Sequence, residues 1–480
     1  MLLARQGLRV LLVDRGTHPR FAIGESSTPI ADMILRDLAR QHDIPELLPL
    51  TRFGSWQATY PQLRCGCKRG FSYFFQRAEE EFASAVEHDR ELLVAASTSR
   101  ALADTHWLRS DVDQFLCQLA REYGVTVIEG CDVHVCQDGS GWRLSGVHEA
   151  GKLNTTAPFV LDATGAGGAL REVLNLGNDA ASLFTSTPGF SGSRAIYGHF
   201  EGVMPWTEVL DDLRVPQIDY PFPCDDAALH HVLEEGWMWQ LRFANGLVSA
   251  GFMLDVSSQP IPTSITPQQE WDLLLNRYPS ICKQFQQATL VAPATGLQRT
   301  GAIQRLVSRA AGDNWALLPH SAGFIDPLHS TGIAHTLAGI ERIIPILQQG
   351  RGGALEVYGE SIRRELQWIH ELVSLCYRVR QSPQLFTLAT MLYFAAVTSY
   401  EQARVRSGTQ HGFLYANHAP LRQAAREVAN RLLLAARQPA SYDLHDVERD
   451  VADMLQPFNQ VGLCDLARHN MYEHTAPPKN

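Results

Sequence analysis

Apolar residues in the first third of the chain occur both in short runs and at helical spacing. The opening "LLARQG" predicts the end of a helix capped by Gly7, and "LRVLLVDRG" after it predicts a buried parallel strand that ends at Asp14. Between residues 106 and 123 the helical spacing is carried by Leu108, Val112, Phe115, Leu116 and Leu119. The following "GVTVIEG" predicts another strand. This alternation is typical of βα units with a parallel sheet.

The rest of the chain adds two more βα units, an antiparallel segment and a helical end. Residues 157–176 and 313–347 each predict a strand, a glycine-bearing loop and a helix. Residues 229–254 predict a short helix followed by two alternating strands joined at Asn245-Gly246. We expect an α/β fold with three parts: a discontinuous Rossmann-like cofactor domain (1–50, 96–175 and 295–349), an inserted antiparallel sheet domain (51–95 and 176–294) and a helical C-terminal region (350–480).

The acidic residue at the end of the first strand indicates a nucleotide-binding unit. A buried strand that ends in an acid such as Asp14 is typical of the second strand of a dinucleotide-binding βαβ unit, where the carboxylate accepts hydrogen bonds from a ribose. The first strand of such a unit and its glycine-rich turn would precede the helix in which Met1 falls. We therefore expect a shortened start, with the first strand lying upstream.

Composition and charge exclude several classes of function. The 480 residues are 45% hydrophobic and 19% charged, and a net charge of -10 gives no basic surface for nucleic acid. Arg5, Gln6 and Arg9 interrupt any signal-peptide core, and no run approaches the roughly 20 apolar residues of a membrane span. The nine cysteines have neither disulfide-framework nor zinc-site spacing. We expect a cytoplasmic protein without a metal site, a membrane partner or a nucleic-acid partner.

Four further segments carry candidate chemistry. They are "HPRFAIGESSTP" with Gly24, Glu25 and Ser26, "DTHWLRSDVDQFL" with Arg109, "LDATGAGGAL" with Asp162 and Gly165, and "SAGFIDPLHSTGIAHT" with Asp326, Ser330, Thr331 and Gly332. Each has an ordinary interpretation by itself: a loop with a proline stop, a capped helix start, a glycine turn, and a helix that begins after a proline. Their order along one chain favours a shared function.

Together these four segments resemble the flavin-dependent halogenases, within the flavin monooxygenase and geranylgeranyl-reductase-like group, over roughly residues 1 to 350. The resemblance implies FAD, used as FADH2, held by Asp14 and by the named residues of these segments up to Asp326. It also implies a halide, chloride or bromide, at the N-terminus of a helix, where unpaired N–H groups and the helix dipole favour an anion. Thr331 and Gly332 would hold it, with Ser330 beside them.

The resemblance also assigns a role to Lys68 in "CGCKRGFSYFF". In this family a lysine lies at the far end of a tunnel from the flavin and passes the halogen of hypohalous acid to an aromatic substrate, as a hydrogen-bond donor or a haloamine. A confined amine also shifts its pKa readily, which suits either role. On composition alone, a solvated surface lysine is the ordinary interpretation.

The sequence differs from the family pattern at three places that bear on the flavin site and on the substrate. Pro319-His320 replace an expected Gly-Asp, and "WMWQLR" keeps Trp237 and Trp239 of a Trp-x-Trp-x-Ile-Pro motif whose tryptophans shield the flavin. His329 takes the place of the glutamate of the tryptophan-specific branch, which favours the branch acting on phenolic or pyrrole-like aromatics. His329 could act as a base toward a phenol, because its ordinary pKa lies near neutrality, or be an ordinary polar residue.

We therefore expect an FADH2- and O2-dependent halogenase, an oxidoreductase of natural-product or antibiotic biosynthesis that acts on a small aromatic substrate. A separate flavin reductase would supply FADH2, because no second nucleotide-binding fingerprint is visible in the sequence. A flavin monooxygenase or reductase of the same fold is the alternative, and a non-catalytic protein of the flavin fold is a third. The sequence leaves the oligomeric state open.

Overall fold

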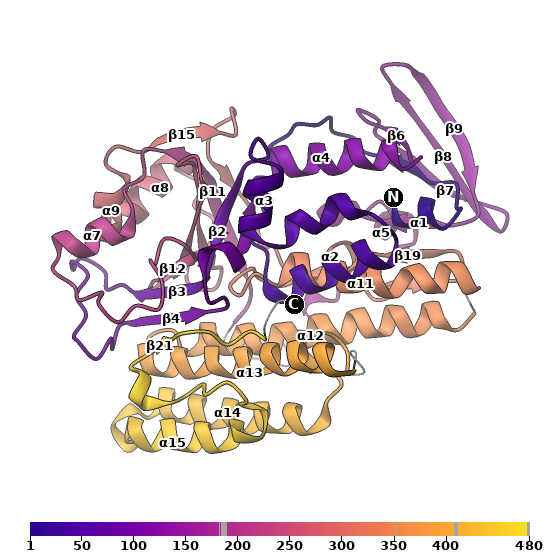
Figure 1. Cartoon of the computed structure of the whole chain (residues 1–480). Coiled ribbons are helices and arrows are strands. Elements are labelled where there is room, and N and C mark those ends of the chain that lie inside the picture. The colour runs from indigo at the N-terminus through magenta and orange to yellow at the C-terminus, as the bar shows by residue number, and fades with distance from the viewer. Residues whose placement is uncertain (182, 184–189, 351, 408–410, 478–480) are drawn as a thin grey trace.

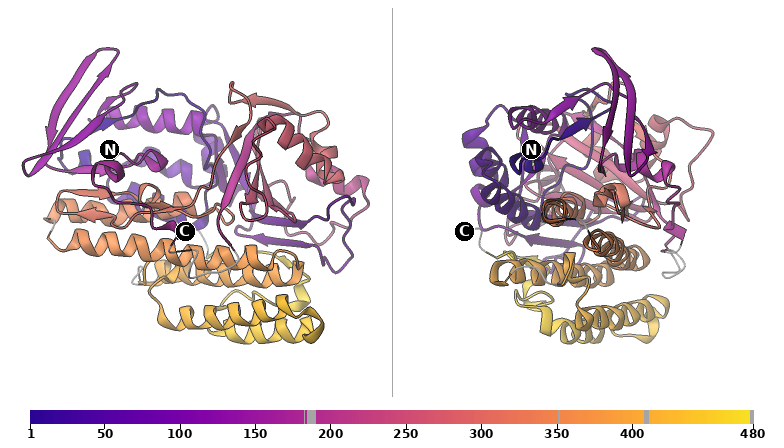
Figure 2. Two further views of the ribbon diagram at one scale, coloured as in Figure 1. Left: turned by 180° about the vertical axis from the view of Figure 1, so that it is seen from behind. Right: turned by 90° about the vertical axis from the view of Figure 1, so that its right-hand side faces the viewer.

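The protein combines a large sheet, a region of short parallel strands and a layer of long helices. The computed structural model describes residues 1–181, 183, 190–350, 352–407 and 411–477. Figure 1 shows the large sheet at the left, the parallel strands with their covering helices at the right, and the C-terminal helices along the bottom. Figure 2 shows the same arrangement from behind and from the side.

The parallel strands form where the apolar runs predict them. β1 (Leu11–Val13) pairs with β6 (Thr126–Ile128), and β10 (Val160–Asp162) pairs with β19 (Trp315–Leu317), both in parallel. The short helix α1 (Leu2–Arg5) ends before Gly7, whose φ of +80° suits a residue without a side chain. α4 (Arg109–Glu122) leads into β6, as the spacing of its apolar residues predicts. The βα units are therefore confirmed, but β1, predicted to be buried, has Leu12 exposed and its other two residues half-buried, since among the described strands it pairs with β6 alone.

The nine-stranded sheet is mostly antiparallel. Its path runs β15-β11-β14-β13-β12-β3-β4-β21, with β16 also paired to β11. The strands are β3 (Gly70–Phe75), β4 (Glu91–Ala95), β11 (Ser193–Glu201), β12 (Ala228–Val232), β13 (Gly236–Arg242), β14 (Val248–Asp255), β15 (Thr289–Ala292), β16 (Gln298–Arg299) and β21 (Met471–Tyr472). Strands far apart in sequence thus meet in one sheet.

One predicted element is wrong. The segment from residue 229, expected to be a short helix, is strand β12, which lies between β3, its parallel neighbour, and β13, its antiparallel neighbour. All five of its residues are buried. Its backbone bonds are therefore made with strands on both sides, and this tertiary pairing overrides the local pattern.

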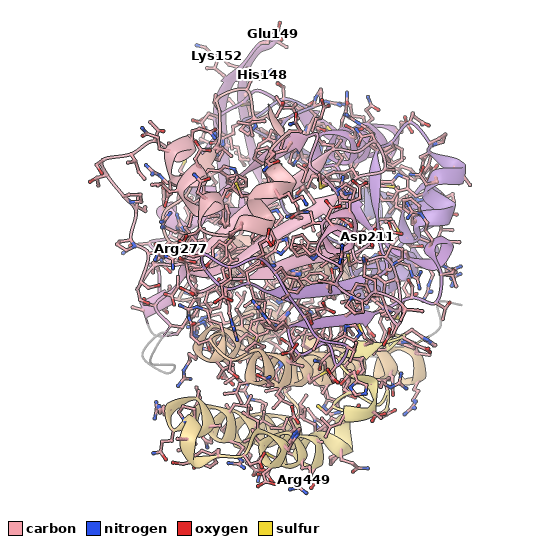
Figure 3. The ribbon with its side chains drawn as sticks, turned by 90° about the vertical axis from the view of Figure 1, so that its left-hand side faces the viewer. His148, Glu149, Lys152, Asp211, Arg277 and Arg449 are labelled. Carbon is pink, nitrogen blue, oxygen red and sulfur yellow. The ribbon has the colours of Figure 1, made fainter. Side chains whose placement is uncertain are left out.

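Smaller sheets and short helices surround these layers. The sheets are β2 (Cys65–Lys68) with β5 (Asp104–Trp107), β17 (Arg305–Leu306) with β20 (Gly323–Phe324), β18 (Ala311–Gly312) beside β19, and the meander β7 (His134–Asp138), β8 (Gly141–His148) and β9 (Gly151–Ala157). The β8–β9 hairpin extends away from the body and carries His148, Glu149 and Lys152 at its tip (Figure 3). The short helices are α3 (Phe53–Thr59), α5 (Ala169–Val173), α7 (Trp206–Asp212), α8 (Pro267–Asn276), α9 (Pro279–Phe285) and α10 (Pro319–Ala322).

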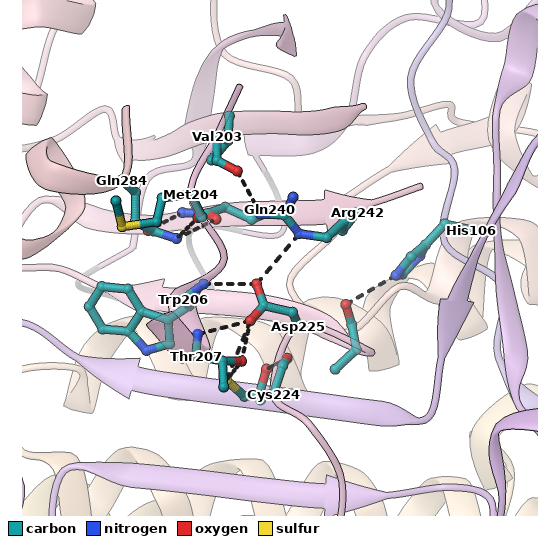
Figure 4. A network of polar contacts seen from close by, with 12 residues as sticks. His106, Val203, Met204, Trp206, Thr207, Cys224, Asp225, Gln240, Arg242 and Gln284 are labelled. Atoms are coloured by element: carbon teal, nitrogen blue, oxygen red, sulfur yellow. Dashed lines mark hydrogen bonds and ion pairs between the residues drawn. The ribbon is translucent and has the colours of Figure 1, made fainter. Parts of the chain in front are cut away.

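A side-chain cap fixes α7 against the large sheet. The carboxylate of Asp225 accepts hydrogen bonds from the backbone N–H groups of Trp206 and Thr207, each at 2.9 Å (Figure 4). Such a carboxylate satisfies the first N–H groups of a helix and suits its positive end. Trp206 is thereby held against the sheet, where its ring meets Phe74 and His231.

The long helices are α2 (Pro29–Gln41), α11 (Thr331–Gln349), α12 (Ala354–Val379), α13 (Pro383–Ser407), α14 (Ala419–Arg437) and α15 (Leu444–Leu455). Every residue of α13 from 385 to 401 is buried, which makes it the central helix of the C-terminal region. Within the described ranges, no helix has the length and apolar character that crossing a bilayer requires.

A buried ion pair joins α11 to α12. Glu365 accepts hydrogen bonds from both terminal nitrogens of Arg342, at 2.6 and 2.8 Å, and its Oε2 lies 2.9 Å from His335 Nε2. Burial alone would raise the pKa of Glu365, but Arg342 and His335 outweigh burial and lower it to about 2. The same carboxylate accepts the N–H of Phe413, so the cluster also fixes the chain ahead of α14.

The register of β13 and β14 fixes the paired tryptophans. Gly251 lies directly opposite Trp239, and a methyl group on Gly251 would come within 2.3 Å of the Trp239 ring and 2.6 Å of Tyr197 Cβ. Trp237, two residues earlier on the same face, donates its ring N–H to the Tyr377 hydroxyl at 2.9 Å. The absence of a side chain at Gly251 therefore makes room for the Trp239 ring.

Glu365→Gln is expected to lower the free energy of unfolding at pH 7 by about 2–3 kcal/mol, because it leaves Arg342 and His335 without their carboxylate. The folded-state pKa lies below the unfolded value of about 4.3, so this stability is present above that pH and is lost as the pH falls toward 2. Denaturant unfolding at several pH values measures it. Glu360→Gln, an exposed site on the same helix, is the control. Equal losses in both variants would contradict the prediction.

Gly251→Ala is expected to lower the free energy of unfolding by about 1–3 kcal/mol and to shift the tryptophan fluorescence, because the added methyl group displaces Trp239. Gly301→Ala is the matched control, since nothing lies within 4 Å of a methyl group there. Denaturant unfolding followed by fluorescence measures both variants. If the Gly251→Ala variant keeps the wild-type stability and spectrum, Trp239 must lie elsewhere.

Candidate active site

Lys68 is buried at the end of β2, where the sequence alone would equally allow a surface residue. Its side chain is 0% exposed, and its ammonium donates a hydrogen bond to the Ser27 carbonyl at 2.7 Å. The same ammonium lies 4.1 Å from the centre of the Phe71 ring. A cation over an aromatic face and a carbonyl acceptor are the contacts that a desolvated amine needs. The amine is therefore confined rather than solvated.

The carbonyl that holds Lys68 belongs to the "GESS" segment. This segment runs beside β5: Ser27 N donates to Thr105 O at 2.9 Å, and Trp107 N donates to Glu25 O. β5 in turn pairs with β2, which places Asp104 directly opposite Lys68. Two stretches that the sequence analysis singled out separately, at residues 24–28 and at Lys68, thus meet in one layer.

Three buried histidines surround Lys68 and are held neutral. Burial first, and the Lys68 ammonium second, lower the pKa of His106 and of His230 to about 3. Burial, His230 and Lys68 also lower the pKa of His329 well below its usual range. Imidazoles that stay neutral at pH 7 add no positive charge around the amine. The positive charge of this layer is thereby concentrated on Lys68.

His329 is joined to a chain of buried polar groups. Its Nδ1 lies 3.1 Å from the Tyr73 hydroxyl and its Nε2 lies 3.6 Å from Cys376 Sγ. Its ring stacks on Tyr393 with 4.0 Å between centroids. Both ring nitrogens therefore have protein partners, and a substrate could use His329 as a base only if one of these contacts opened.

The "DPL" loop is fixed by Asp326. Its carboxylate accepts hydrogen bonds from Ser193 Oγ at 2.5 Å, from the Tyr377 hydroxyl at 2.9 Å and from the backbone N–H of Leu328 at 3.0 Å. Burial raises the pKa of Asp326 to about 6 although these hydrogen bonds lower it. Tyr377 also receives the Trp237 ring N–H, so Trp237 and the loop are parts of one network.

The loop ends at the N-terminus of α11, which has no side-chain cap. Ser330 is the residue before the helix, with a left-handed φ of +55°, and its side chain makes no capping hydrogen bond. Thr331 is buried, and a methyl group on Gly332 would meet no atom within 4 Å. Among the described residues the first turn of this 19-residue helix therefore faces open space beside Gly332.

An internal cavity connects these pieces. Thr28 of the "GESST" segment, Phe71 below Lys68, Thr331 of α11, and Tyr393 and Glu401 of α13 all line it. Its open volume is about 20 Å³, which holds roughly one water molecule. The candidate halide site and the ring that contacts Lys68 thus face the same small space.

Several of the residues expected to bind FAD lie beside backbone that is exposed or that carries no bulky side chain. An Arg109 terminal nitrogen donates to the carbonyls of Ile23 and Gly24, and the "ATGAG" turn from residue 163 is largely exposed, with Gly165 at a φ of +59°. The Ser26 hydroxyl is buried and makes no hydrogen bond with any residue that the structure describes. An unsatisfied buried hydroxyl and accessible glycine backbone fit a cofactor that supplies polar atoms and needs close approach.

The carboxylates of three other expected residues are engaged by protein groups. Glu25 Oε1 lies 2.8 Å from His199 Nε2. Asp162 accepts the N–H groups of Thr164 and Leu170, so it shapes the glycine turn itself. Asp14 accepts the N–H of Gly16 and pairs with Arg20. Of the three, only Asp14 is partly exposed. Glu25 and Asp162 could support a cofactor only through the backbone that they hold.

His320, which replaces an expected aspartate, also lies at this turn. A methyl group on Gly165 would lie 3.4 Å from the His320 ring. Burial and the charges of Arg305 and Arg109 lower the pKa of His320 to about 4, so a neutral imidazole stands where a carboxylate was expected.

Several residues of this site could not be predicted from the sequence. Tyr73, His230, Tyr377, Ser193 and Glu401 come from five separate elements, and no local motif marks them. A second group, His18, Cys117 and Glu129, could offer ligand atoms within 4.8 Å of one another, but Glu129 already pairs with His18 and Arg121. Only the long-range fold brings the missed residues together.

Comparisons with known proteins identify halogenases among the relatives of this chain. The tryptophan halogenase family model matches residues 214–386. The chain is 32% identical to monodechloroaminopyrrolnitrin halogenase PrnC of Pseudomonas fluorescens and 30% identical to tetracycline 7-halogenase of Kitasatospora aureofaciens, over 71% and 70% of its own length. It spans 58% of the length of each of these two relatives.

The fold is shared with a solved halogenase. The crystal structure of halogenase PltM in complex with phloroglucinol and FAD superposes with a TM-score of 0.83, at 22% identity, over 98% of this chain and 96% of that one. The brominase Bmp2 superposes with a TM-score of 0.60 at 18% identity, over 90% and 95% of the two chains. The expected α/β fold, with its antiparallel sheet and helical C-terminal region, is thereby confirmed. The chain belongs to the flavin-dependent halogenase family.

Proposed function

We propose that this protein halogenates an electron-rich aromatic substrate, phenolic or pyrrole-like, with chloride or bromide, O2 and FADH2. The observation that carries the proposal is the confined ammonium of Lys68, held by the Ser27 carbonyl and the Phe71 ring beside the cavity that Thr331 also lines. Relatives whose names describe halogenases of aminopyrrolnitrin and tetracycline types support it, as does a structure of PltM with phloroglucinol, a phenol.

The proposed cofactor site combines the unsatisfied buried hydroxyl of Ser26 with the accessible backbone of Gly165. Both residues would lie against FAD, and Arg109, whose guanidinium pairs with Asp113, would lie beside them. A separate reductase would supply FAD in reduced form. When bound and reduced, FAD supplies the reaction with O2 that converts halide into hypohalous acid. The expected ligands Gly24, Glu25, Asp14, Asp162 and Asp326 would hold the surrounding backbone and loops.

Different residues of the chain would bind halide, position the halogen and limit substrate access. The uncapped N-terminus of α11 at Thr331 and Gly332, beside Ser330, attracts halide, because its N–H groups carry partial positive charge. Lys68 holds hypohalous acid or its halogen at the aromatic carbon that reacts. Trp237 and Trp239, fixed by Tyr377 and by the space at Gly251, form an apolar wall that limits which path a substrate takes.

Lys68→Met is expected to lower halide-dependent product formation by about 100-fold or more, since the side chain keeps its length but loses its N–H donors. The assay supplies chemically reduced FAD, O2, bromide and phloroglucinol, and detects products by mass spectrometry. Flavin binding, read by absorbance, should stay as in the wild type. Arg69→Met, which changes the neighbouring base, is the control and should stay active. Full activity of the Lys68 variant, or oxygenated product without halide, would contradict the proposal.

Gly332→Ala is expected to keep the stability of the protein, because the structure leaves space for the methyl group. If halide binds at this helix N-terminus, the same methyl group enters its site, and the KM for halide should rise about tenfold, more for bromide than for the smaller chloride. Gly301→Ala serves again as the neutral control. An unchanged halide KM in a stably folded variant would place the halide elsewhere.

A further inference from the structure

Glu401 brings a buried acidic side chain to the wall of the internal cavity. Glu401 lies near the end of the buried stretch of α13, is 1% exposed and lines the internal cavity. Among the described lining residues it is the one carboxylate, and the wall around it is mainly apolar and aromatic. Burial and the Glu401 charge raise the pKa of the neighbouring Tyr393, which places that charge close to the aromatic wall.

Polar groups lie in or behind two parts of the cavity lining. On one side Phe71 separates it from the Lys68 ammonium by a single ring, since the ammonium lies 4.1 Å from the ring centre. On the same side Thr28 follows the carbonyl that holds Lys68. Glu401 belongs to another part of the lining, on the C-terminal helices. An aromatic ring placed between these groups would contact apolar walls while one edge group could reach a carboxylate.

We propose that Glu401 accepts a hydrogen bond from the hydroxyl or N–H group of the aromatic substrate and so fixes which ring carbon faces Lys68. This inference rests on the proposed function and adds the residue that orients the substrate through its acidic O–H or N–H group. A carboxylate acceptor makes a charge-assisted hydrogen bond, which is stronger than one between neutral groups. A hydrogen bond to the carboxylate also increases the electron density on the substrate's oxygen or nitrogen. The aromatic ring then reacts more readily with an electrophilic halogen.

The size of the cavity requires a wall that opens. An open volume of about 20 Å³ is far below the roughly 150 Å³ of a protein cavity that holds benzene. A surface groove of about 400 Å³ lies next to it, and Thr475 and Ala476 line both spaces. The substrate would therefore enter from the groove and occupy a chamber that forms when these two residues shift.

Thr475 and Ala476 form the partition between the cavity and the groove, and their segment is held by few hydrogen bonds. β21 pairs with β4 over two residues, and Thr475 donates its N–H to the Ala95 carbonyl at 3.0 Å. Its neighbours Gln402, Val405 and Gln460 line the outer groove. A short edge pairing can open locally at low free-energy cost. The partition can thus move without disturbing α13, which carries Glu401.

Phenol and anisole test the inference, because anisole replaces the hydroxyl hydrogen by a methyl group. The wild-type protein is expected to bind phenol at least tenfold more tightly than anisole, measured by calorimetry, and to halogenate phenol with a fixed ratio of ortho to para product. Glu401→Met, which has no acceptor, should lose the preference and change that ratio. Glu401→Gln, which keeps a neutral acceptor, should show an intermediate preference.

The control is Glu341→Gln, which removes a carboxylate that pairs with Arg404 of α13 but is absent from the cavity wall. It should keep the wild-type preference and product ratio. If the folded Glu401 variants also keep both, the inference is overturned. A wild type that forms no halide-dependent product would overturn the proposed function alone, because the binding preference reports on Glu401 without turnover.

Discussion

The buried ammonium of Lys68 is the constraint around which the rest of this structure is arranged. A charged amine removed from water needs acceptors, and here they are the Ser27 carbonyl and the face of Phe71. One comes from the "GESST" loop ahead of α2, which also bonds to β5, and the other from β3 of the large sheet. The position of one amine therefore ties the parallel part of the fold to the antiparallel sheet.

The surroundings of Lys68 follow from the same constraint. Neighbouring imidazoles would repel it if charged, and burial keeps His106, His230 and His329 neutral. Their hydrogen bonds and stacking contacts then fix the loop that leads into α11. The helix N-terminus, the Phe71 ring that contacts Lys68 and a carboxylate on α13 line one small cavity. A positive amine behind the Phe71 ring and a negative carboxylate in the wall can orient an aromatic ring that carries a polar group.

The sequence predicted the elements whose chemistry is local and missed those created by tertiary pairing. The helix at Thr331, the glycine turn at Gly165 and the strand that ends near Asp14 were visible because their residue types are required by the backbone. β12 was mistaken for a helix because its neighbours in the sheet, β3 and β13, decide its structure. Glu401 was invisible because α13 is buried on all sides, so its residue pattern distinguishes no face.

In the proposed reaction, halogen and aromatic ring meet between Lys68 and Glu401. A crystal structure of the protein with FAD and para-bromophenol, recorded at the bromine absorption edge, would locate both ends of the substrate. We expect one anomalous bromine peak on the Phe71 side of the opened chamber and the phenolic oxygen within hydrogen-bond distance of Glu401. A bromophenol bound in the reverse orientation, or outside this chamber, would show that Glu401 does not orient the substrate.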